Sequence, residues 1–249
     1  MNRFLKGAMI LTIAGVIVKI IGAFSKVLVA RILGGEGIGL YMMAYPIYQI
    51  IVSISAAGIP VAISIMIAEK LANRDMRGVQ QVFNVSLRVL TLVGIIFSVG
   101  LYASAEWLIK WNIITDSRAL IPIQLLSPAI IVVTILSCFR GYFQGFQYMV
   151  PTGTSQVFEQ IFRVGSMVGL AYYFIDSGLH LAAGGATFAT FPGVLAGLIV
   201  LVYFYRSQRS LRQQMLSEQN EEAPIECTSA VIKRLFALAI PVSMANIML

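Results

Sequence analysis

AMILTIAGVIVKIIGAFSKVLVA, residues 8–30, is an apolar run in which Lys19 and Lys26 are the charged residues. A helix needs about 20 mostly apolar residues to cross a bilayer, so this run predicts a membrane-spanning helix. Runs of similar character follow at 38–68, 79–104, 120–139, 151–175 and 182–205, and another begins near 231. The sequence therefore predicts an all-α, polytopic membrane helix bundle with six transmembrane helices and the start of a seventh.

Composition supports the same fold class. The chain of 249 residues is 58% hydrophobic and 12% charged, with a mean hydropathy of +0.85. A soluble domain of this length could not bury so much apolar surface. The formal charge of +7 could indicate a nucleic-acid partner, but the cations lie mostly at the ends of the apolar runs, so we expect no nucleic acid. Because Lys19 interrupts the first run and no small-residue cleavage site follows it, we expect an uncleaved first helix.

The second run is too long for one straight span. Residues 38–68 would form a helix about 45 Å long, against a hydrocarbon core of about 30 Å. Gly58-Ile59-Pro60 offers a place to bend, because proline lacks a backbone donor and clashes with the preceding turn. We expect the second helix to tilt, bend or protrude there.

Lysine and arginine outside the spans predict the orientation, because cytoplasmic loops are enriched in them. Eleven lie in one set of alternating segments: Arg3, Lys6, Lys70, Arg74, Arg77, Arg140, Arg206, Arg209, Arg212, Lys233 and Arg234. The opposite set holds three: Arg31, Lys110 and Arg118. This asymmetry predicts a multi-pass protein of the bacterial inner membrane with a cytoplasmic N-terminus.

The chain divides into three parts by composition. Residues 1–205 form the six-helix unit, and residues 206–230 form a cytoplasmic linker that changes from basic to acidic and reads as a surface helix followed by a tether. Residues 231–249 begin a seventh helix whose basic start resembles the start of the chain. Because the sequence stops inside that helix, we expect a truncated protein whose C-terminal lobe is missing.

Five charged residues fall inside predicted spans: Lys19, Lys26, Arg88, Glu159 and Arg163. A charge near the bilayer centre costs about 2.5–3.5 kcal/mol on insertion scales, so such side chains usually face a bundle interior or a polar cavity. Lys19 and Lys26 are seven residues apart and share one helix face. Lys26 and Arg88 could instead extend to the headgroups, whereas Lys19 lies near mid-span, where this is hard.

Glu159 and Arg163 are four residues apart with the acid first, the favourable order for an ion pair within one helix. The five charges still sum to about +3, and lysine and arginine donors suit phosphate oxygens. We expect a cationic cavity for an anionic passenger, with Lys19, Lys26, Arg31 and Arg88 as headgroup contacts and Glu159 with Arg163 as a pair that rearranges.

Other residues carry structural expectations. Gly165, Gly169, Gly193 and Gly197 predict closely packed helices. Tyrosines near helix ends are typical of interfacial belts: Tyr41, Tyr45, Tyr48, Tyr172, Tyr173, Tyr203 and Tyr205. With one histidine, two distant cysteines and no phosphate-binding loop, the sequence predicts no metal site, no cofactor and no enzyme.

Two stretches carry a family resemblance. VARILGGEGIGLYMMAYPIYQIIVSISAAGIPVAISIMIAEK lies within residues 19–70, and FRGYFQGFQYMVPTGTSQVFEQIFRV covers residues 139–164. Together they resemble the polysaccharide-export proteins akin to stage V sporulation protein B, in the multidrug/oligosaccharidyl-lipid/polysaccharide (MOP) exporter superfamily. The resemblance implies one lobe of a two-lobed, MATE-like transporter that works by alternating access.

Related MurJ-type flippases, which export lipid II, are similar around VARILG and use cationic residues on their first helix. Aligned there, Lys19 falls on one such position and Ser25 on another, next to Lys26. The acid that MurJ-type proteins have early in the second helix falls near Leu40, so any ion coupling that depends on it is not carried over.

The sequence therefore predicts a flippase for a lipid-linked anionic saccharide, such as a peptidoglycan or polysaccharide precursor, with membrane lipids as its surroundings. A cation-coupled drug exporter of the same superfamily is one alternative, although it would favour an acidic cavity. A membrane accessory subunit of envelope or spore-wall synthesis that moves no substrate is the other.

Overall fold

The computed structural model describes residues 3–56, 58–217 and 226–248, and these contain helices and no strand. The α-helices are α1 (Arg3–Ala56), α2 (Ile59–Ala72), α3 (Met76–Lys110), α4 (Leu120–Gly145), α5 (Val150–Phe174), α6 (Leu179–Phe188), α7 (Thr190–Ser207), α8 (Arg209–Ser217) and α9 (Thr228–Met248). Two short 3-10 turns, η1 (Ser117–Ala119) and η2 (Ile175–Ser177), join α3 to α4 and α5 to α6. The predicted all-α class is confirmed.

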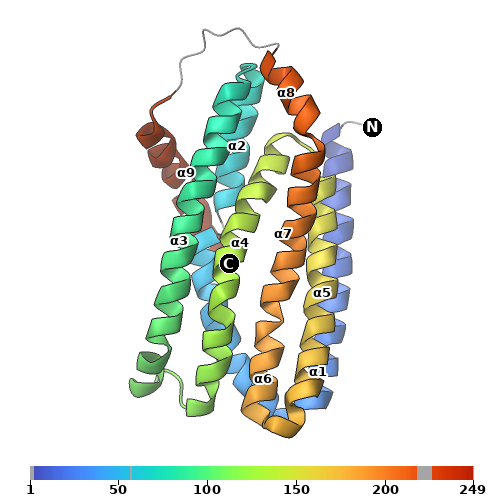
Figure 1. Ribbon diagram of the computed structural model, residues 1–249, viewed down its shortest axis with the longest axis vertical. Helices are drawn as coiled ribbons and strands as arrows, with labels where there is room; N and C mark the ends of the chain where they lie inside the picture. Colours follow the sequence, from blue (N-terminus) through green and yellow to red (C-terminus); the bar gives the residue numbers. More distant parts are fainter. Residues whose placement is uncertain (1–2, 57, 218–225, 249) are drawn as a thin grey trace.

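The first two predicted spans are joined by a one-residue break. Within α1, Gly34 has φ 66° and ψ −175°, a backbone conformation that favours glycine. The helix changes direction there and returns along the bundle (Figure 1). It ends at Ala56, four residues before Pro60, whose ring would clash with the carbonyl of that residue. The predicted bend at Gly58-Ile59-Pro60 is therefore present as the α1–α2 break.

The last predicted span is also two helices. It comprises α6 and α7, and α6 ends at Phe188, again four residues before a proline, Pro192. The fourth span is longer than predicted, because α4 continues to Gly145 instead of ending at residue 139. Arg140, which the topology argument placed in a loop, therefore lies inside a helix. Without it, the basic residues outside the spans number ten against three, so the asymmetry remains.

The helices run nearly parallel to one long axis (Figure 1). The start of α1, the α2–α3 and α4–α5 connections and α8 lie at one end, as the predicted alternation requires. By length and composition, four described stretches can cross a membrane: residues 5–72, 76–110, 117–145 and 179–207. The first of these contains both the Gly34 break and the α1–α2 break. The chain is thus a membrane protein with several apolar spans, and α5 runs beside them as a more polar helix.

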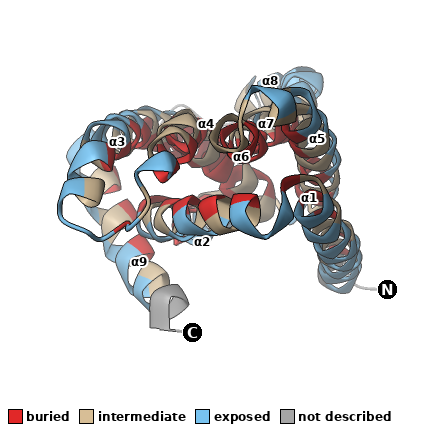
Figure 2. Cartoon of the chain, turned by 90° about the horizontal axis from the view of Figure 1, so that it is seen from below, coloured by how far each residue is buried: buried red, intermediate tan, exposed pale blue. Residues whose placement is uncertain are grey.

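Two apolar cores hold the bundle together. One joins α2, α3, α4, α7 and α9, with Ile63, Leu90 and Phe143 among its fully buried side chains. The other joins both halves of α1 to α3, α4, α5 and α6, with Leu40 and Ile130 fully buried. Figure 2 shows these buried residues where the helices face one another, while the outer faces are exposed. α4 belongs to both cores and is the central helix.

Polar contacts fasten the start of α9 to the six-helix unit. Lys70 donates to Glu226 at 2.7 Å and lies 3.2 Å from Asp75, at the α2–α3 connection. Further along α9, the Ser243 hydroxyl accepts a hydrogen bond from the Gly58 amide at 3.0 Å, at the α1–α2 break. The helix α9, predicted as the start of a seventh span, therefore packs against the α1–α2 break. The tether predicted within the linker falls on residues 218–225, outside the described residues, and α8 precedes it.

At the opposite end, the α1 break is tied to the α3–α4 connection. Arg118 lies 2.6 Å from Glu36 and 2.8 Å from Asp116. Hydrogen bonds from the Arg118 side chain and backbone hold the pKa of the exposed Asp116 below its usual value. These contacts are at the surface, where an ion pair contributes little to stability.

Candidate functional site

Two parts of the second stretch of the resemblance, RGYFQG from residue 140 and EQIFR from residue 159, meet inside the bundle. Arg140 on α4 donates from Nη2 to Oε2 of Glu159 on α5 at 2.7 Å, and both side chains are 19% exposed. The predicted intrahelical pair of Glu159 with Arg163 is wrong in this respect, because the acid pairs across helices. Glu159 pairs with Arg140 because the Arg140 side chain extends from the neighbouring helix α4 toward the carboxylate.

The Arg140 guanidinium is not fully paired. Its Nε is buried and has no hydrogen-bond partner in the described part of the chain. A buried donor without a partner costs free energy, and this cost would fall if the Nε–H donated to an oxygen atom. Arg140 is therefore a site residue that the sequence analysis missed, since it was assigned to a loop.

Arg163 bonds within its own helix. It donates from Nη2 to Oε1 of Gln160, which is 2% exposed. The other end of this amide faces α1: a Cβ built on Gly22 would lie 3.1 Å from Gln160 Nε2. The polar face of α5 thus packs on the first half of α1 at Gly22.

Glycines on α7 let it approach this polar face. A Cβ on Gly193 would lie 2.6 Å from Arg163 Cβ, and one on Gly197 would lie 3.2 Å from Glu159 Cβ. The predicted close packing is confirmed for these two glycines. For Gly165 and Gly169 it is wrong, because a Cβ there would meet nothing within 4 Å.

A tyrosine ladder on the second half of α1 borders the same site. Tyr41 and Tyr45 stack with ring centroids 5.4 Å apart, and Tyr45 and Tyr48 follow at 5.9 Å. Tyr48 is only 4% exposed and lies within electrostatic reach of Glu159 and Arg163. The interfacial role expected for Tyr48 is therefore wrong, and it belongs to the bundle interior.

Lys19 and Lys26 lie on an exposed face of α1 whose composition is unusual. We define the cationic stripe as Ala8, Thr12, Gly15, Lys19, Ala23, Lys26 and Ala30, residues that recur every three or four positions. The adjacent apolar stripe, offset by one residue, is Met9, Ile13, Val16, Ile20, Phe24 and Val27, each more than 40% exposed. One side of the exposed face suits lipid, whereas the other carries only small, polar and cationic side chains.

The depth of these lysines follows from the contacts of α1 with α5. Gly7 is level with the start of α5, since its Cβ would lie 2.9 Å from Met149 Cγ. Lys19 is twelve residues further, about 18 Å along the axis, and Lys26 about 28 Å. If the hydrocarbon core begins level with the start of α5, Lys19 is near the middle of its thickness of about 30 Å. Lys19 also lies within one turn of the Gly22–Gln160 contact.

Arg31 and Arg88 do not lie near Lys19 and the Gly22–Gln160 contact. Arg31 is exposed near the Gly34 break, at the far end of the first half of α1. Arg88 is exposed on α3, on one face with the exposed Leu92 and Val99. In Figure 2, α3 and the first half of α1 occupy opposite sides of the bundle. The structure therefore separates Arg88 from the lysines.

The structure also shows where the two positions aligned with MurJ-type site residues, Ser25 and Leu40, lie. Ser25 is 4% exposed and donates to the Gly22 carbonyl at 2.7 Å, so it faces the bundle and not the cationic stripe. Leu40 is 1% exposed in the apolar core, in place of an acid. Lys19 and Lys26, two turns apart, are the cations that the first helix presents at its surface within the span.

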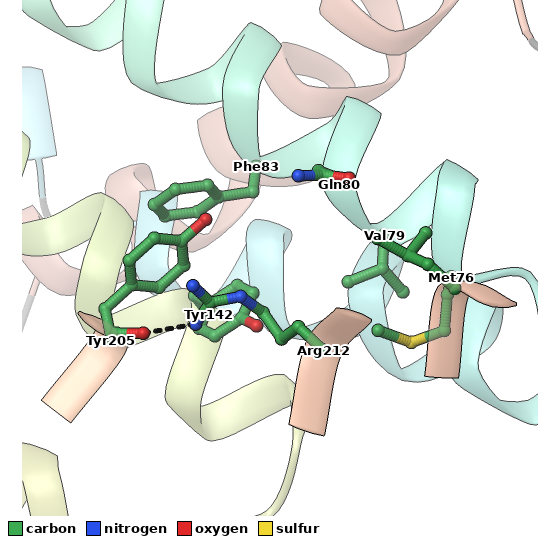
Figure 3. Close-up of a pocket in the computed structure, with 8 residues that line it drawn as sticks. Met76, Val79, Gln80, Phe83, Tyr142, Tyr205 and Arg212 are labelled. Atoms are coloured by element: carbon green, nitrogen blue, oxygen red, sulfur yellow. Dashed lines mark hydrogen bonds between the residues drawn. The ribbon is translucent and has the colours of Figure 1, made fainter. Parts of the chain in front are cut away.

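A pocket at the α8 end is closed by an arginine. The Arg212 guanidinium carbon stacks 3.7 Å from the centroid of the Tyr205 ring, and Arg212 also donates to the Tyr205 carbonyl (Figure 3). Phe83 and Tyr142 complete the wall. The remaining space is about 10 Å³, room for at most one water. The contacts of Arg212 hold α8 against the bundle, and the remaining space is too small for a lipid-linked substrate.

The side chains of this arrangement offer guanidinium and ammonium donors and one carboxylate. No group of three or more His, Cys, Asp or Glu side chains in the described ranges could hold a metal ion. What the bundle brings together instead is the Arg140–Glu159 pair and Arg163 with Gln160, while Lys19 and Lys26 lie on the neighbouring exposed face of α1.

Comparison with known proteins gives the family. The chain is 34% identical to stage V sporulation protein B of Bacillus subtilis over 211 residues, 85% of this chain and 40% of that protein. It is 27% identical to the lipid II flippase MurJ of the same organism over 250 residues, 96% of this chain and 46% of that protein. The chain thus spans about half the length of these relatives.

Solved structures support the fold. An outward-facing multidrug MATE transporter of the MOP superfamily superposes with a TM-score of 0.79 at 15% identity, over 98% of this chain and 52% of that one. A MOP-superfamily transporter from Pyrococcus furiosus gives 0.76 at 15%, over 99% and 53%. Residues 4–247 match the family described as polysaccharide biosynthesis protein. The chain belongs to this polysaccharide biosynthesis family, and its fold resembles that of the MATE transporters.

Proposed function

We propose that this chain is a lobe of a flippase that carries a lipid-linked anionic saccharide across the bacterial inner membrane by alternating access. The relatives support an exporter of the MOP superfamily, and one of them is named for flipping lipid II. The passenger is a peptidoglycan or polysaccharide precursor whose phosphate groups contact cationic side chains and whose lipid tail stays in the bilayer.

The cationic stripe of α1 is the observation that carries this proposal. Lys19 stands at mid-membrane depth on a face of small residues, one residue away from a face of large apolar ones. A lysine turned to lipid at that depth costs about 2.5–3.5 kcal/mol and cannot easily reach the headgroups. A face on which Gly15 and Ala23 flank Lys19 instead leaves room for a ligand beside the ammonium group.

The polar interior beside the stripe strengthens the same reading. Arg140 and Arg163 outnumber Glu159, so the buried part of the site has an excess of positive charge. A cationic site favours phosphate over the cationic drugs that a cation-coupled exporter would carry. Glu159 serves as the removable partner: a phosphate that binds Arg140 can displace it.

In the proposed topology the N-terminus and α8 face the cytoplasm, which the distribution of basic residues favours. The passenger would enter from that side, where lipid-linked precursors are assembled. Alternating access rocks one lobe against another. The exposed cationic stripe would then face the space between this lobe and a second one.

The test is complementation of cells depleted of their own flippase with the gene that encodes this protein, scored by the accumulation of lipid-linked precursor. Lys19→Ala should leave the precursor accumulated, because the mid-membrane ammonium group is lost, and Lys19→Arg should restore much of the export. Lys233→Ala, an exposed lysine on α9, is the matched control and should export normally.

The same experiment separates the rivals. If Lys19→Ala exports normally while the protein itself is required, an accessory subunit that moves no substrate explains the result better. If the cells instead gain resistance to cationic drugs and show no change in precursor, a cation-coupled drug exporter replaces the flippase.

A further inference from the structure

A second pocket lies far from the site described above, at the end of the bundle where the chain starts. Its walls come from the beginning of α1 and from the α4–α5 connection: Lys6, Gly7, Ile10, Phe146, Gln147, Tyr148, Met149 and Val150. Its volume is about 350 Å³, enough for a phosphate with its glycerol attachment.

Two backbone features build this pocket. The helix α4 ends with Gln147 in the left-handed conformation at φ 54°. The Tyr148 amide donates to the Phe143 carbonyl at 3.0 Å, and that of Gln147 donates to Gln144 at 2.9 Å, the hydrogen-bond pattern of a Schellman motif. The chain therefore turns sharply into α5, and the absence of a side chain at Gly7 lets α1 approach Met149.

The lining of this pocket combines one charged side chain with polar and apolar ones. Lys6 is the charged side chain among the lining residues, and Gln147 and Tyr148 add polar groups beside it. Ile10, Phe146 and Val150 supply apolar surface. A pocket lined by one lysine and by several apolar side chains fits a molecule with an anionic head and an apolar body.

The position of the pocket agrees with that chemistry. Lys6 belongs to the second turn of α1, level with the start of α5, and thus lies at the height of the lipid headgroups if α5 begins at the membrane surface. The first half of α1 forms the lateral edge of the bundle, where bilayer lipid has access (Figure 2).

We propose that this pocket binds the headgroup of an anionic phospholipid, with the Lys6 ammonium group on the phosphate and the first acyl carbons against Ile10 and Phe146. The site is separate from the cationic stripe, since Lys6 lies about 20 Å along α1 from Lys19. A bound lipid would pin the start of α1 to the α4–α5 turn. The proposal does not depend on the proposed transport function.

The experiment is native mass spectrometry of the full chain in detergent, titrated with phosphatidylglycerol and, separately, with phosphatidylcholine. Phosphatidylglycerol should bind more tightly, and Lys6→Ala should weaken its binding about fivefold, because one surface lysine contributes on that order. Lys233→Ala is the control and should bind phosphatidylglycerol as the unchanged protein does.

A second variant tests the apolar wall without a change of charge. Ile10→Trp should fill the pocket and weaken phosphatidylglycerol binding while the circular dichroism of the protein stays helical. Equal affinity for the two lipids, or equal losses in Lys6→Ala and Lys233→Ala, would overturn the proposal.

Two further probes identify the source of the phosphate. Inorganic phosphate at millimolar concentration should not displace phosphatidylglycerol, because it lacks the apolar contacts. If it does displace the lipid, the pocket is a site for free phosphate. If Lys6→Ala weakens binding of a polyprenyl diphosphate and leaves phosphatidylglycerol unaffected, the pocket belongs to the substrate and the lipid assignment is wrong.

Discussion

Removing the acid of the buried pair should destabilise the bundle strongly. In Glu159→Gln, Arg140 keeps its charge but loses the negative charge of the carboxylate 2.7 Å away, and its Nε already lacks a hydrogen bond. Breaking a fully buried ion pair from one side costs about 3–5 kcal/mol. Because both side chains here are 19% exposed, we expect a smaller cost of about 2–3 kcal/mol.

That cost corresponds to a fall of about 4–12 °C in the apparent unfolding temperature for a chain of this size. The assay uses a thiol-reactive dye that fluoresces when the buried Cys138 becomes accessible, in a background where the exposed Cys227 is replaced by serine. The double variant Arg140→Met/Glu159→Met should recover most of the loss, because an apolar pair leaves no charge unpaired.

The matched control is Glu36→Gln, whose carboxylate pairs with Arg118 at the surface and is 62% exposed. It should change stability by less than about 1 kcal/mol. If Glu36→Gln and Glu159→Gln shift the unfolding temperature equally, or if the double methionine variant is as unstable as the single one, the assignment of a buried, interhelical pair is refuted.

Three other substitutions test the packing. Gly193→Val should cost about 1–3 kcal/mol, measured by the same dye, because its Cβ would lie 2.6 Å from that of Arg163; an unchanged unfolding temperature would contradict the α5–α7 contact. Gly165→Ala should instead stabilise by up to about 1 kcal/mol, since its Cβ meets nothing within 4 Å; a loss of stability would mean that this face is covered. Gly58→Val should displace α9, because a side chain there overlaps the Ala239 carbonyl; we expect faster proteolysis of the linker, and normal resistance would argue against the docking.

The fold class and the succession of long helices could be predicted from the sequence because hydropathy in a membrane protein is a strong, local signal. The predicted span at 151–175 is a helix, α5, but it is not among the stretches apolar enough to cross a membrane. The bend at Pro60 was predictable for the same reason: the clash of a proline ring with an earlier carbonyl is local. Proline alone is not sufficient, however, since Pro46 and Pro128 lie inside continuous helices. The break at Pro60 is also stabilised by a contact with α9, because the Ser243 hydroxyl accepts a hydrogen bond from the Gly58 amide.

The partners of the charged residues could not be predicted from spacing. Glu159 and Arg163 satisfy the rule for an intrahelical pair, but α4 brings Arg140 closer, and contact between helices far apart in sequence carries no periodic signal. The charge of Arg140 made the apolar run appear to end at residue 139. The two glycines of RGYFQG, four residues apart, were the feature of the sequence that could have indicated a packed helix. In the structure, a Cβ on Gly141 or Gly145 would lie less than 3 Å from α2 side chains.

The lysine stripe was predictable in part. The seven-residue spacing of Lys19 and Lys26 places them on one face, which the structure contains, but which side of α1 packs on α5 required coordinates. Only then does the division of the exposed face into a small, cationic half and a large, apolar half become visible.

The most direct test of the account is whether Lys19 borders water or lipid in the cell membrane. In a background with both cysteines replaced by serine, Lys19→Cys and Ile20→Cys place thiols on the two adjacent stripes at the same depth. A charged, membrane-impermeant thiol reagent should modify the Lys19→Cys protein, with protection by a polyprenyl diphosphate, and should leave the Ile20→Cys protein unmodified. Equal labelling at both positions, or labelling at Ile20→Cys alone, would contradict the claim that the cationic stripe lines a polar passage.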